Sequence, residues 1–141
     1  MHFVNADLIA AGLSPLDPPA AQVAAARILL EALDRLAKAR VDFAFETTLS
    51  GRTYLDRIRN WREAGYRIEI VFLRLPTVEF ALRRVANRVK QGGHDVPAAD
   101  VRRRFTRGLH NFDTEYKDLA HAWSMCDNDG PVPHLIIEHN G

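Results

Sequence analysis

Two carboxylates stand where a predicted strand gives way to a helix or loop, and both are placed for acid–base or metal chemistry. Asp7 comes shortly after a short apolar run at the start of the chain, and Glu46 ends the apolar run 41–46. In an open parallel α/β sheet, ligands bind beyond the carboxyl ends of the strands. One acid is therefore predicted to be the general base for a substrate hydroxyl, and the other a ligand of magnesium or water. The hydroxyls of Thr47 and Thr48 are placed to assist.

The same region also has a purely structural interpretation. Asn5 or Asp7 is suited to capping the helix that follows, because short polar side chains accept the first free amide protons of a helix. Thr48 or Ser50 is likewise suited to capping a helix predicted to begin near Arg52. Capping and chemistry use the same residue types, so both interpretations stay open from the spacing alone.

A cluster of basic residues between positions 77 and 110 forms the second group of candidates. Eight arginines and lysines stand there against three acids, whereas the whole chain has a net charge of +1. Arg84 with Arg88, and Arg103 with Arg107, lie one helical turn apart and opposite the apolar stripes of their predicted helices. Guanidinium groups on two helices joined by a turn suit a lid that neutralises phosphoryl oxygens. The basic residues of this cluster are Arg83, Arg84, Arg88, Lys90, Arg102, Arg103, Arg104 and Arg107.

Three smaller features complete the set of candidates. The segment 91–97 contains a Gly-Gly turn closed by proline and is predicted to be a hinge, in which His94 either binds substrate or caps the turn. Asp127 and Asn128 follow a predicted strand and either contact a nucleotide base or form a turn. Cys126 is expected to be a buried, inert thiol.

Composition limits the class of protein. The chain has 141 residues, of which 47% are hydrophobic, which is the size of one domain with an ordinary core. A single cysteine excludes an internal disulfide framework and suits the cytoplasm. No apolar run approaches the roughly 20 residues that cross a bilayer, and no signal peptide is evident. The basic residues are not interleaved with exposed aromatics, so neither nucleic acid nor a membrane is expected as a partner.

Predicted strands and helices alternate along the chain. This alternation predicts an α/β fold with a mostly parallel sheet and helices on both faces. The predicted strands are 3–4, 41–46, 67–75, 124–127 and 134–138. The predicted helices are 19–40, 52–64, 77–91, 98–109 and 114–122, and the arginine-rich lid covers about 77–110.

Several long blocks of the sequence resemble the zeta-toxin family of P-loop kinases, in particular its chromosomal bacterial branch. The blocks occur in family order and end with the Asp-Asn of MCDND. They are FVNADLIAAGLSP, FAFETTLSGRTYLDRIRNW, GYRIEIVFLRLP, RVANRVKQGGHDVP and VRRRF. The resemblance implies a three-layer P-loop kinase-like fold and a cytoplasmic ATP- and Mg²⁺-dependent kinase. Its implied substrate is a hydroxyl of a UDP-linked amino sugar such as UDP-N-acetylglucosamine, and its implied partner is an antitoxin protein.

The resemblance also implies roles by position. Asp7 matches the base that deprotonates or orients the substrate hydroxyl, and Glu46 with Thr48 matches a substrate-binding pair, with Glu46 also a candidate magnesium ligand. The residues assigned to catalysis are Asp7, Arg88, Arg103 and Arg104. Those assigned to substrate are Asn5, Glu46, Thr47, Thr48 and Arg52, and those assigned to the nucleotide are Arg84, Asp127 and Asn128.

One element of such kinases is not found in the sequence. The motif G-x-x-x-x-G-K-[ST], whose amides and lysine hold the nucleotide phosphates, occurs nowhere, and the adjacent pair Gly92-Gly93 leads to His94. The family's first, central strand is expected between the strands that end at Glu46 and Leu75. Three explanations are open: a truncated kinase that lacks about 40 upstream residues, a non-catalytic remnant that binds a nucleotide sugar or a protein, or a homodimer that exchanges a strand.

Residues 1–141 by themselves are predicted to bind ATP weakly or not at all, because the sequence has no phosphate-binding motif. Isothermal titration calorimetry with magnesium-ATP measures this directly. A micromolar dissociation constant for residues 1–141 would overturn the prediction.

Overall fold

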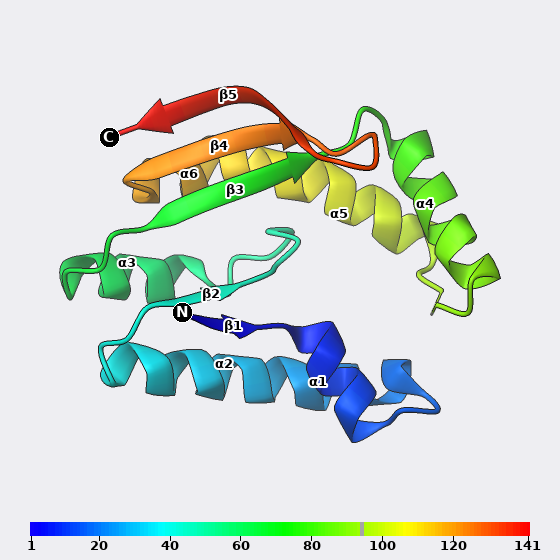
Figure 1. Ribbon diagram of the computed structural model, residues 1–141, viewed down its shortest axis with the longest axis horizontal. Helices are drawn as coiled ribbons and strands as arrows, with labels where there is room; N and C mark the ends of the chain where they lie inside the picture. Colours follow the sequence, from blue (N-terminus) through cyan, green and yellow to red (C-terminus); the bar gives the residue numbers. More distant parts are fainter. Residues whose placement is uncertain (94) are drawn as a thin grey trace. The chain divides into compact units, whose positions relative to one another are not determined.

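The computed structural model describes residues 1–93 and 95–141, and the chain divides into two units, Met1–Thr47 and Thr48–Gly141. Each unit has a small sheet and helices of its own (Figure 1). The first unit consists of β1 (His2–Val4), α1 (Ala6–Leu13), the 3₁₀ helix η1 (Pro18–Ala21), α2 (Gln22–Lys38) and β2 (Phe43–Phe45).

The long helix α2 organises the first unit. Prolines occupy the first positions of η1, and α2 follows directly. Proline is tolerated there because an amide proton at the start of a helix has no acceptor within the helix. Ala25, Leu29 and Leu33 recur every four residues along α2, and all three are buried. Ala10 of α1 packs against Ala25, which fixes α1 on α2. The predicted helix 19–40 is confirmed, with its first turn in the 3₁₀ form.

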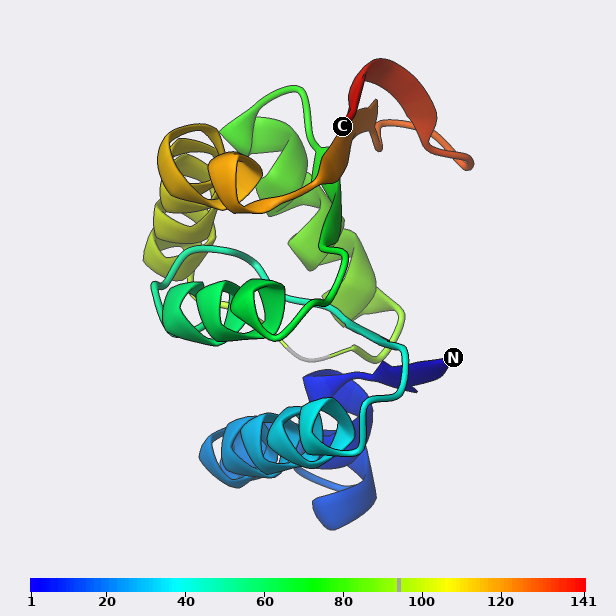
Figure 2. The same ribbon diagram turned by 90° about the vertical axis from the view of Figure 1, so that its left-hand side faces the viewer.

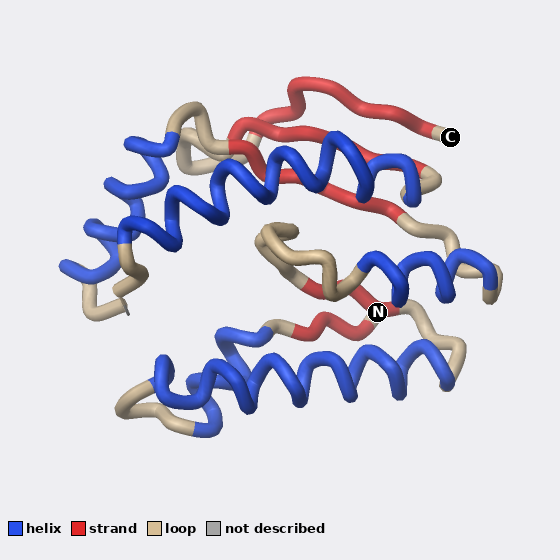
Figure 3. Tube along the Cα trace, turned by 180° about the vertical axis from the view of Figure 1, so that it is seen from behind, coloured by secondary structure: helices blue, strands red, loops and turns tan. Residues whose placement is uncertain are grey.

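The strands β1 and β2 are parallel neighbours. His2 pairs with Phe43 and Val4 with Phe45, so both strands reach their carboxyl ends at the same edge (Figure 3). The connection between them runs through α1 and α2, as a parallel pair requires. The residues that follow each strand therefore emerge side by side.

The second unit begins with a loop and has three strands. Its elements are α3 (Leu55–Glu63), β3 (Glu69–Arg74), α4 (Val78–Lys90), α5 (Ala98–Asn111), the π-helical segment η2 (Phe112–Tyr116), α6 (Lys117–Leu119), β4 (Ala122–Asp127) and β5 (His134–Asn140). The strand order is β3-β4-β5, with β3 parallel and β5 antiparallel to β4.

One face of this three-stranded sheet carries the aromatic core of the second unit. Phe112 of η2 stacks on Phe72 of β3 at 4.7 Å between ring centroids and meets Trp123 of β4 edge-on at 5.6 Å. The helices α5 and α6 lie on this side (Figure 2). Residues of β3 alternate between half-buried and exposed, as expected for a strand that is covered on one face. On the other face Val71 and Leu73 are at least half exposed.

The helices α4 and α5 pack on each other through small and branched apolar residues. Ala81 and Val85 of α4 and Val101 of α5 are buried together, and Phe105 packs against them. This packing confirms the apolar stripes predicted for helices 77–91 and 98–109. It also leaves the arginine-bearing faces of both helices outside the contact.

The helix predicted at 114–122 is wrong in its bounds. α5, η2 and α6 form one continuous helical run from Ala98 to Leu119 (Figure 3), and Ala122 already belongs to β4. Within this run, the amide of Lys117 donates to the carbonyl of Phe112 five residues earlier. That spacing is a π-helical turn, which local sequence patterns do not predict.

The α/β fold of the P-loop kinase-like class is confirmed, with two departures from a single parallel sheet. β5 runs antiparallel to β4, and β2 and β3 belong to different sheets among the described residues. No helix in the described part of the chain is both long and apolar enough to cross a membrane.

Phe112 is predicted to be the main anchor between the helices and the sheet of the second unit. Its side chain is fully buried between two aromatic rings, so Phe112→Ala should lower the free energy of unfolding by about 3–5 kcal/mol. Urea denaturation followed by tryptophan fluorescence measures the change. The exposed Val132→Ala is the matched control and should change stability by less than about 0.5 kcal/mol. Equal effects of the two variants would contradict the assignment.

Candidate active site

The first unit places three predicted site residues at one edge of its sheet. Asn5 follows β1 and Glu46 follows β2, and the parallel register sets them opposite each other. The Asn5 side-chain amide donates to Glu46 Oε2 at 2.9 Å. Asp7 stands in the first turn of α1, and both carboxylate residues are exposed. The structure therefore joins Asn5 to Glu46 directly and to the backbone of Asp7, and the catalytic roles assigned to these residues stay predictions.

Asn5 joins this edge to the helix. Its side-chain oxygen accepts from the backbone amides of Asp7 at 2.9 Å and Leu8 at 3.1 Å, so Asn5 is the N-cap of α1. The capping interpretation is therefore right for Asn5 and wrong for Asp7. The side-chain oxygen of Asn5 bonds to the helix and its side-chain nitrogen bonds to Glu46. These bonds together fix the orientation of the Asn5 side chain and the position of Glu46. The Asp7 carboxylate lies at the positive end of the helix, where negative charge is favoured.

The second unit begins with the loop that follows Glu46 and Thr47, both of which are exposed. Thr48 and Ser50 share a hydrogen bond between their hydroxyl oxygens at 2.8 Å, and the Ser50 amide also donates to Thr48 Oγ1. The helix α3 begins at Leu55, and no side chain caps it. The prediction that Thr48 or Ser50 caps this helix is therefore wrong, and the Thr48 hydroxyl belongs to the loop.

Arg52 is held by a residue that the sequence did not single out. Its guanidinium forms an ion pair with Glu115 of η2, and it also keeps 67% of its side chain exposed. Glu115 was missed because its partner is 63 residues away in the chain, and no local pattern connects the two. The pair holds one nitrogen of the Arg52 guanidinium, Nη1, while most of the side chain stays exposed.

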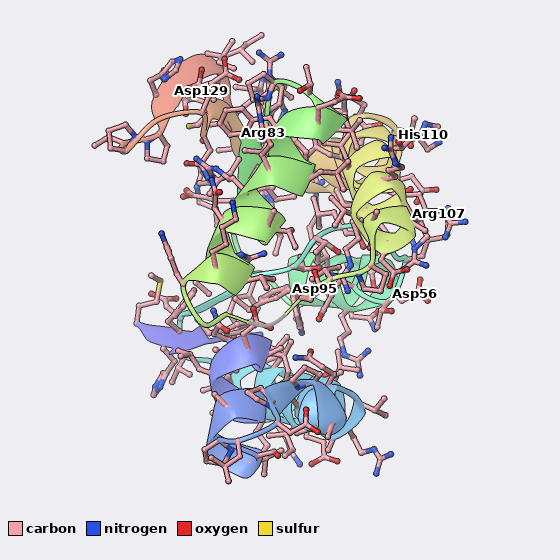
Figure 4. All side chains as sticks on the ribbon, turned by 90° about the vertical axis from the view of Figure 1, so that its right-hand side faces the viewer. Asp56, Arg83, Asp95, Arg107, His110 and Asp129 are labelled. Atoms are coloured by element: carbon pink, nitrogen blue, oxygen red, sulfur yellow. The ribbon has the colours of Figure 1, made fainter. Side chains whose placement is uncertain are left out.

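The arginines of α4 and α5 differ in how they are held. The guanidinium of Arg84 lies 5.2 Å from the Phe80 ring centroid, a cation–π contact, and Arg103 forms an ion pair with Asp100 at 2.9 Å. Arg88 and Arg104 are exposed. Figure 4 shows Arg107 extending from α5 away from α4. The second unit therefore presents several guanidinium groups on its surface.

The turn after α4 depends on its glycines. Gly92 has a φ of +87°, and a Cβ on Gly93 would lie 2.9 Å from the carbonyl oxygen of Arg88. The Gly93 amide donates to that same oxygen at 2.7 Å, which closes the end of the helix. The predicted Gly-Gly turn is confirmed, and His94 lies outside the described residues.

Asp127 is bound tightly within the sheet. Arg74 donates through Nε to Asp127 Oδ1 at 2.9 Å and through Nη2 to Oδ2 at 3.2 Å, and the Asn128 amide donates to the Arg74 carbonyl. The hydrogen bond from Arg74 lowers the pKa of Asp127 below its usual value of 3.8. The half-buried neighbour Cys126 is less enclosed than the sequence predicted.

Among the described residues, one group of side chains has the spacing of metal ligands. Asp127, Asp129 and His134 offer ligand atoms within 4.8 Å of one another. Both oxygens of Asp127 already accept hydrogen bonds from Arg74, whose positive charge opposes a cation at this position. The arrangement therefore fits an ion-paired end of β3 and β4 better than a metal centre.

Comparisons with known proteins identify related sequences. The family model described as Zeta toxin matches residues 19–133. A Haemophilus influenzae protein, described only as an uncharacterized protein, is 29% identical over 102 residues, which cover 72% of this chain and 73% of that protein. No solved structure matches the chain.

Removal of the Arg74 guanidinium in Arg74→Gln is predicted to raise the pKa of Asp127. A carboxyl group with a lowered pKa in the folded state stabilises the fold above its unfolded pKa, and this contribution is lost as the pH falls through the folded value. The variant should therefore lose stability at neutral pH and approach wild type in acid. Carboxyl NMR titration and urea denaturation at several pH values measure both effects.

Arg67→Gln is the matched control, because Arg67 pairs with Glu69 at the other end of β3. It should leave the pKa of Asp127 unchanged. An unshifted Asp127 in Arg74→Gln would show that the pair does not set this pKa.

Proposed function

The chain belongs to the zeta toxin family, and we propose that the protein expressed from its gene is an ATP-dependent kinase to which residues 1–141 contribute the acceptor site. Its proposed acceptor is a hydroxyl group of a UDP-linked amino sugar such as UDP-N-acetylglucosamine. The observation that carries this proposal is the edge of the first sheet, where Asp7 and Glu46 stand exposed beside the shared Asn5. An exposed carboxylate at a strand-to-helix corner suits proton transfer from a hydroxyl acceptor.

Asp7 is the proposed general base. Its carboxylate accepts the proton of the acceptor hydroxyl as the hydroxyl oxygen attacks the phosphoryl group. The cap formed by Asn5 keeps the first turn of α1 in place, so the Asp7 backbone is fixed although its side chain is exposed. A base on a fixed backbone meets the positional demands of proton transfer.

The acceptor is proposed to bind through the residues that follow β2. Glu46 accepts hydrogen bonds from sugar hydroxyls, and Thr47 and Thr48 contribute hydroxyls that both donate and accept. Arg52 supplies a positive charge for the diphosphate of the nucleotide sugar. Its pairing with Glu115 leaves most of the Arg52 side chain exposed, which supports this role.

The arginines of α4 and α5 are proposed to neutralise charge during transfer. Arg88 and Arg104 are exposed, and Arg84 and Arg103 are held by Phe80 and Asp100 respectively. Guanidinium groups stabilise the charge that spreads over phosphoryl oxygens in the transition state.

The residues described here fit the acceptor side of a kinase better than the nucleotide side. The sequence has no G-x-x-x-x-G-K-[ST] motif, so no phosphate cradle for ATP can be assigned to residues 1–141. Asp127 and Asn128 are proposed to contact the nucleotide base, and Glu46 is the proposed acidic contact for magnesium. When bound, magnesium would balance phosphate charge.

A second candidate is a non-catalytic protein that binds a nucleotide sugar or a partner such as an antitoxin. The observation that favours it is the same lack of a phosphate-binding motif in the sequence. Binding of UDP-N-acetylglucosamine without consumption of ATP would identify this function, whereas transfer of phosphate to the sugar would exclude it.

Asp7→Asn is predicted to lower phosphoryl transfer by at least about 100-fold, because an amide cannot accept the proton. The affinity for magnesium-ATP should stay within about twofold of wild type, since Asp7 acts on the acceptor. The rate is measured with the protein expressed from its gene, and the affinity by calorimetry.

Asp17→Asn is the matched control from the same unit. Asp17 is also exposed next to a helix, and its side chain makes no capping hydrogen bond. This control should retain full activity. An Asp7→Asn variant with wild-type turnover would remove Asp7 from the role of base.

A further inference from the structure

The loop from Thr48 to Arg52 is held along its length by one helical surface. The side-chain amide of Asn111 donates to the Leu49 carbonyl at 2.7 Å, and the Tyr116 hydroxyl donates to the Gly51 carbonyl at 2.9 Å. Glu115 forms the ion pair with Arg52 described above. Three residues from the end of α5 and from η2 thus hold three residues of the loop.

A fourth residue, Gly108, allows the backbone of the loop to lie close to α5. A Cβ on the buried Gly108 would lie 2.6 Å from the Thr48 carbonyl oxygen, which is closer than atoms of this kind come in proteins. Only glycine leaves room for the Thr48 backbone against α5. We refer to Gly108, Asn111, Glu115 and Tyr116 together as the loop frame.

Gly108, Asn111 and Glu115 stand at positions i, i+3 and i+7 and share one face in any α-helix, and the π-helical turn brings Tyr116 to that face. In an uninterrupted α-helix, residues five apart such as Asn111 and Tyr116 would point about 140° away from each other. A turn with five-residue hydrogen bonding brings them to the same side, and the Lys117 amide makes this bond to Phe112. π-Helical turns frequently occur at functional sites.

The loop itself has a conformation that needs support. Leu49 has a φ of +54°, which is unfavourable for a residue with a branched side chain, and it is buried. Such conformations persist where the surroundings fix them. Burial raises the pKa of Tyr116 above its usual value of 10.0, so its hydroxyl remains a donor to the loop at physiological pH.

We infer that the loop frame is a positioning device, which fixes the backbone of the loop so that Thr48 and Arg52 present their side chains to the phosphate acceptor. The role of the acceptor rests on the function proposed above. The hydrogen bonds of Asn111 and Tyr116 and the close approach at Gly108 are made to the backbone of the loop, so these residues are proposed to act through Thr48 and Arg52. The frame itself is independent of the ligand.

The test compares Tyr116→Phe and Asn111→Ala with wild type. Each variant removes one hydrogen bond to a loop carbonyl. Amide hydrogen exchange of residues 49–53, measured by mass spectrometry, should become about five- to tenfold faster, while exchange in β3 and β4 stays unchanged. Affinity for UDP-N-acetylglucosamine, measured by calorimetry, should fall by a similar factor.

His110→Ala is the matched control, because His110 is an exposed residue of the same helix next to Asn111 (Figure 4). It should change neither exchange nor affinity. Unchanged loop exchange in both test variants would overturn the inference, whatever the activity of the protein. Faster loop exchange in a protein whose wild type does not bind UDP-N-acetylglucosamine would support the frame and reject the proposed acceptor.

Discussion

The candidate site depends first on the parallel pairing of β1 and β2. Because Val4 pairs with Phe45, the residues that follow the two strands emerge next to each other, although they are 41 positions apart in the chain. The Asn5 side chain then connects Glu46 to the first turn of α1 through three hydrogen bonds. A shift of the register by one residue would separate Asn5 from Glu46 and break the hydrogen bond between them.

The second unit depends on one continuous helical run. Phe112 at the start of η2 holds the three-stranded sheet, and the adjacent residues of the same run hold the loop from Thr48 to Arg52. Sheet, helix and loop are thus tied to a single segment. Burial of the Phe112 ring is expected to stabilise this unit more than any single surface ion pair does.

Much of the fold could be predicted from the sequence, because its signals are local. Apolar residues recur at helical spacing in α2 and α4, and the faces that they form are buried. Leu29 and Leu33 of α2 and Val85 of α4 are examples. The alternation of half-buried and exposed side chains in β3 and the glycine turn after α4 also follow from signals between neighbouring residues. The general rule that ligands bind beyond the carboxyl ends of parallel strands also selected Asp7 and Glu46 as candidates, although it did not predict the hydrogen bond between Asn5 and Glu46.

The remaining features depend on contacts between distant residues. Nothing near Phe112 indicates a π-helical turn, and nothing near Glu115 indicates Arg52 as its partner. The antiparallel direction of β5 is the exception, because the connection 128–133 is too short for a parallel crossover and the spacing of the predicted strands already required it. Thr48 and Ser50 have the residue types of helix caps, but the helix begins only at Leu55, and their hydroxyls bond to each other instead.

The central proposal is that the protein expressed from this gene transfers phosphate from ATP to a hydroxyl of a nucleotide sugar. It is tested most directly by incubating the protein expressed from its gene with magnesium-ATP and, separately, UDP-N-acetylglucosamine, UDP-glucose and free N-acetylglucosamine, followed by mass spectrometry of each acceptor. The account predicts a singly phosphorylated UDP-N-acetylglucosamine, formed in equal amount with ADP. A folded protein that yields no phosphorylated acceptor, or that hydrolyses ATP without modifying any sugar, would contradict it.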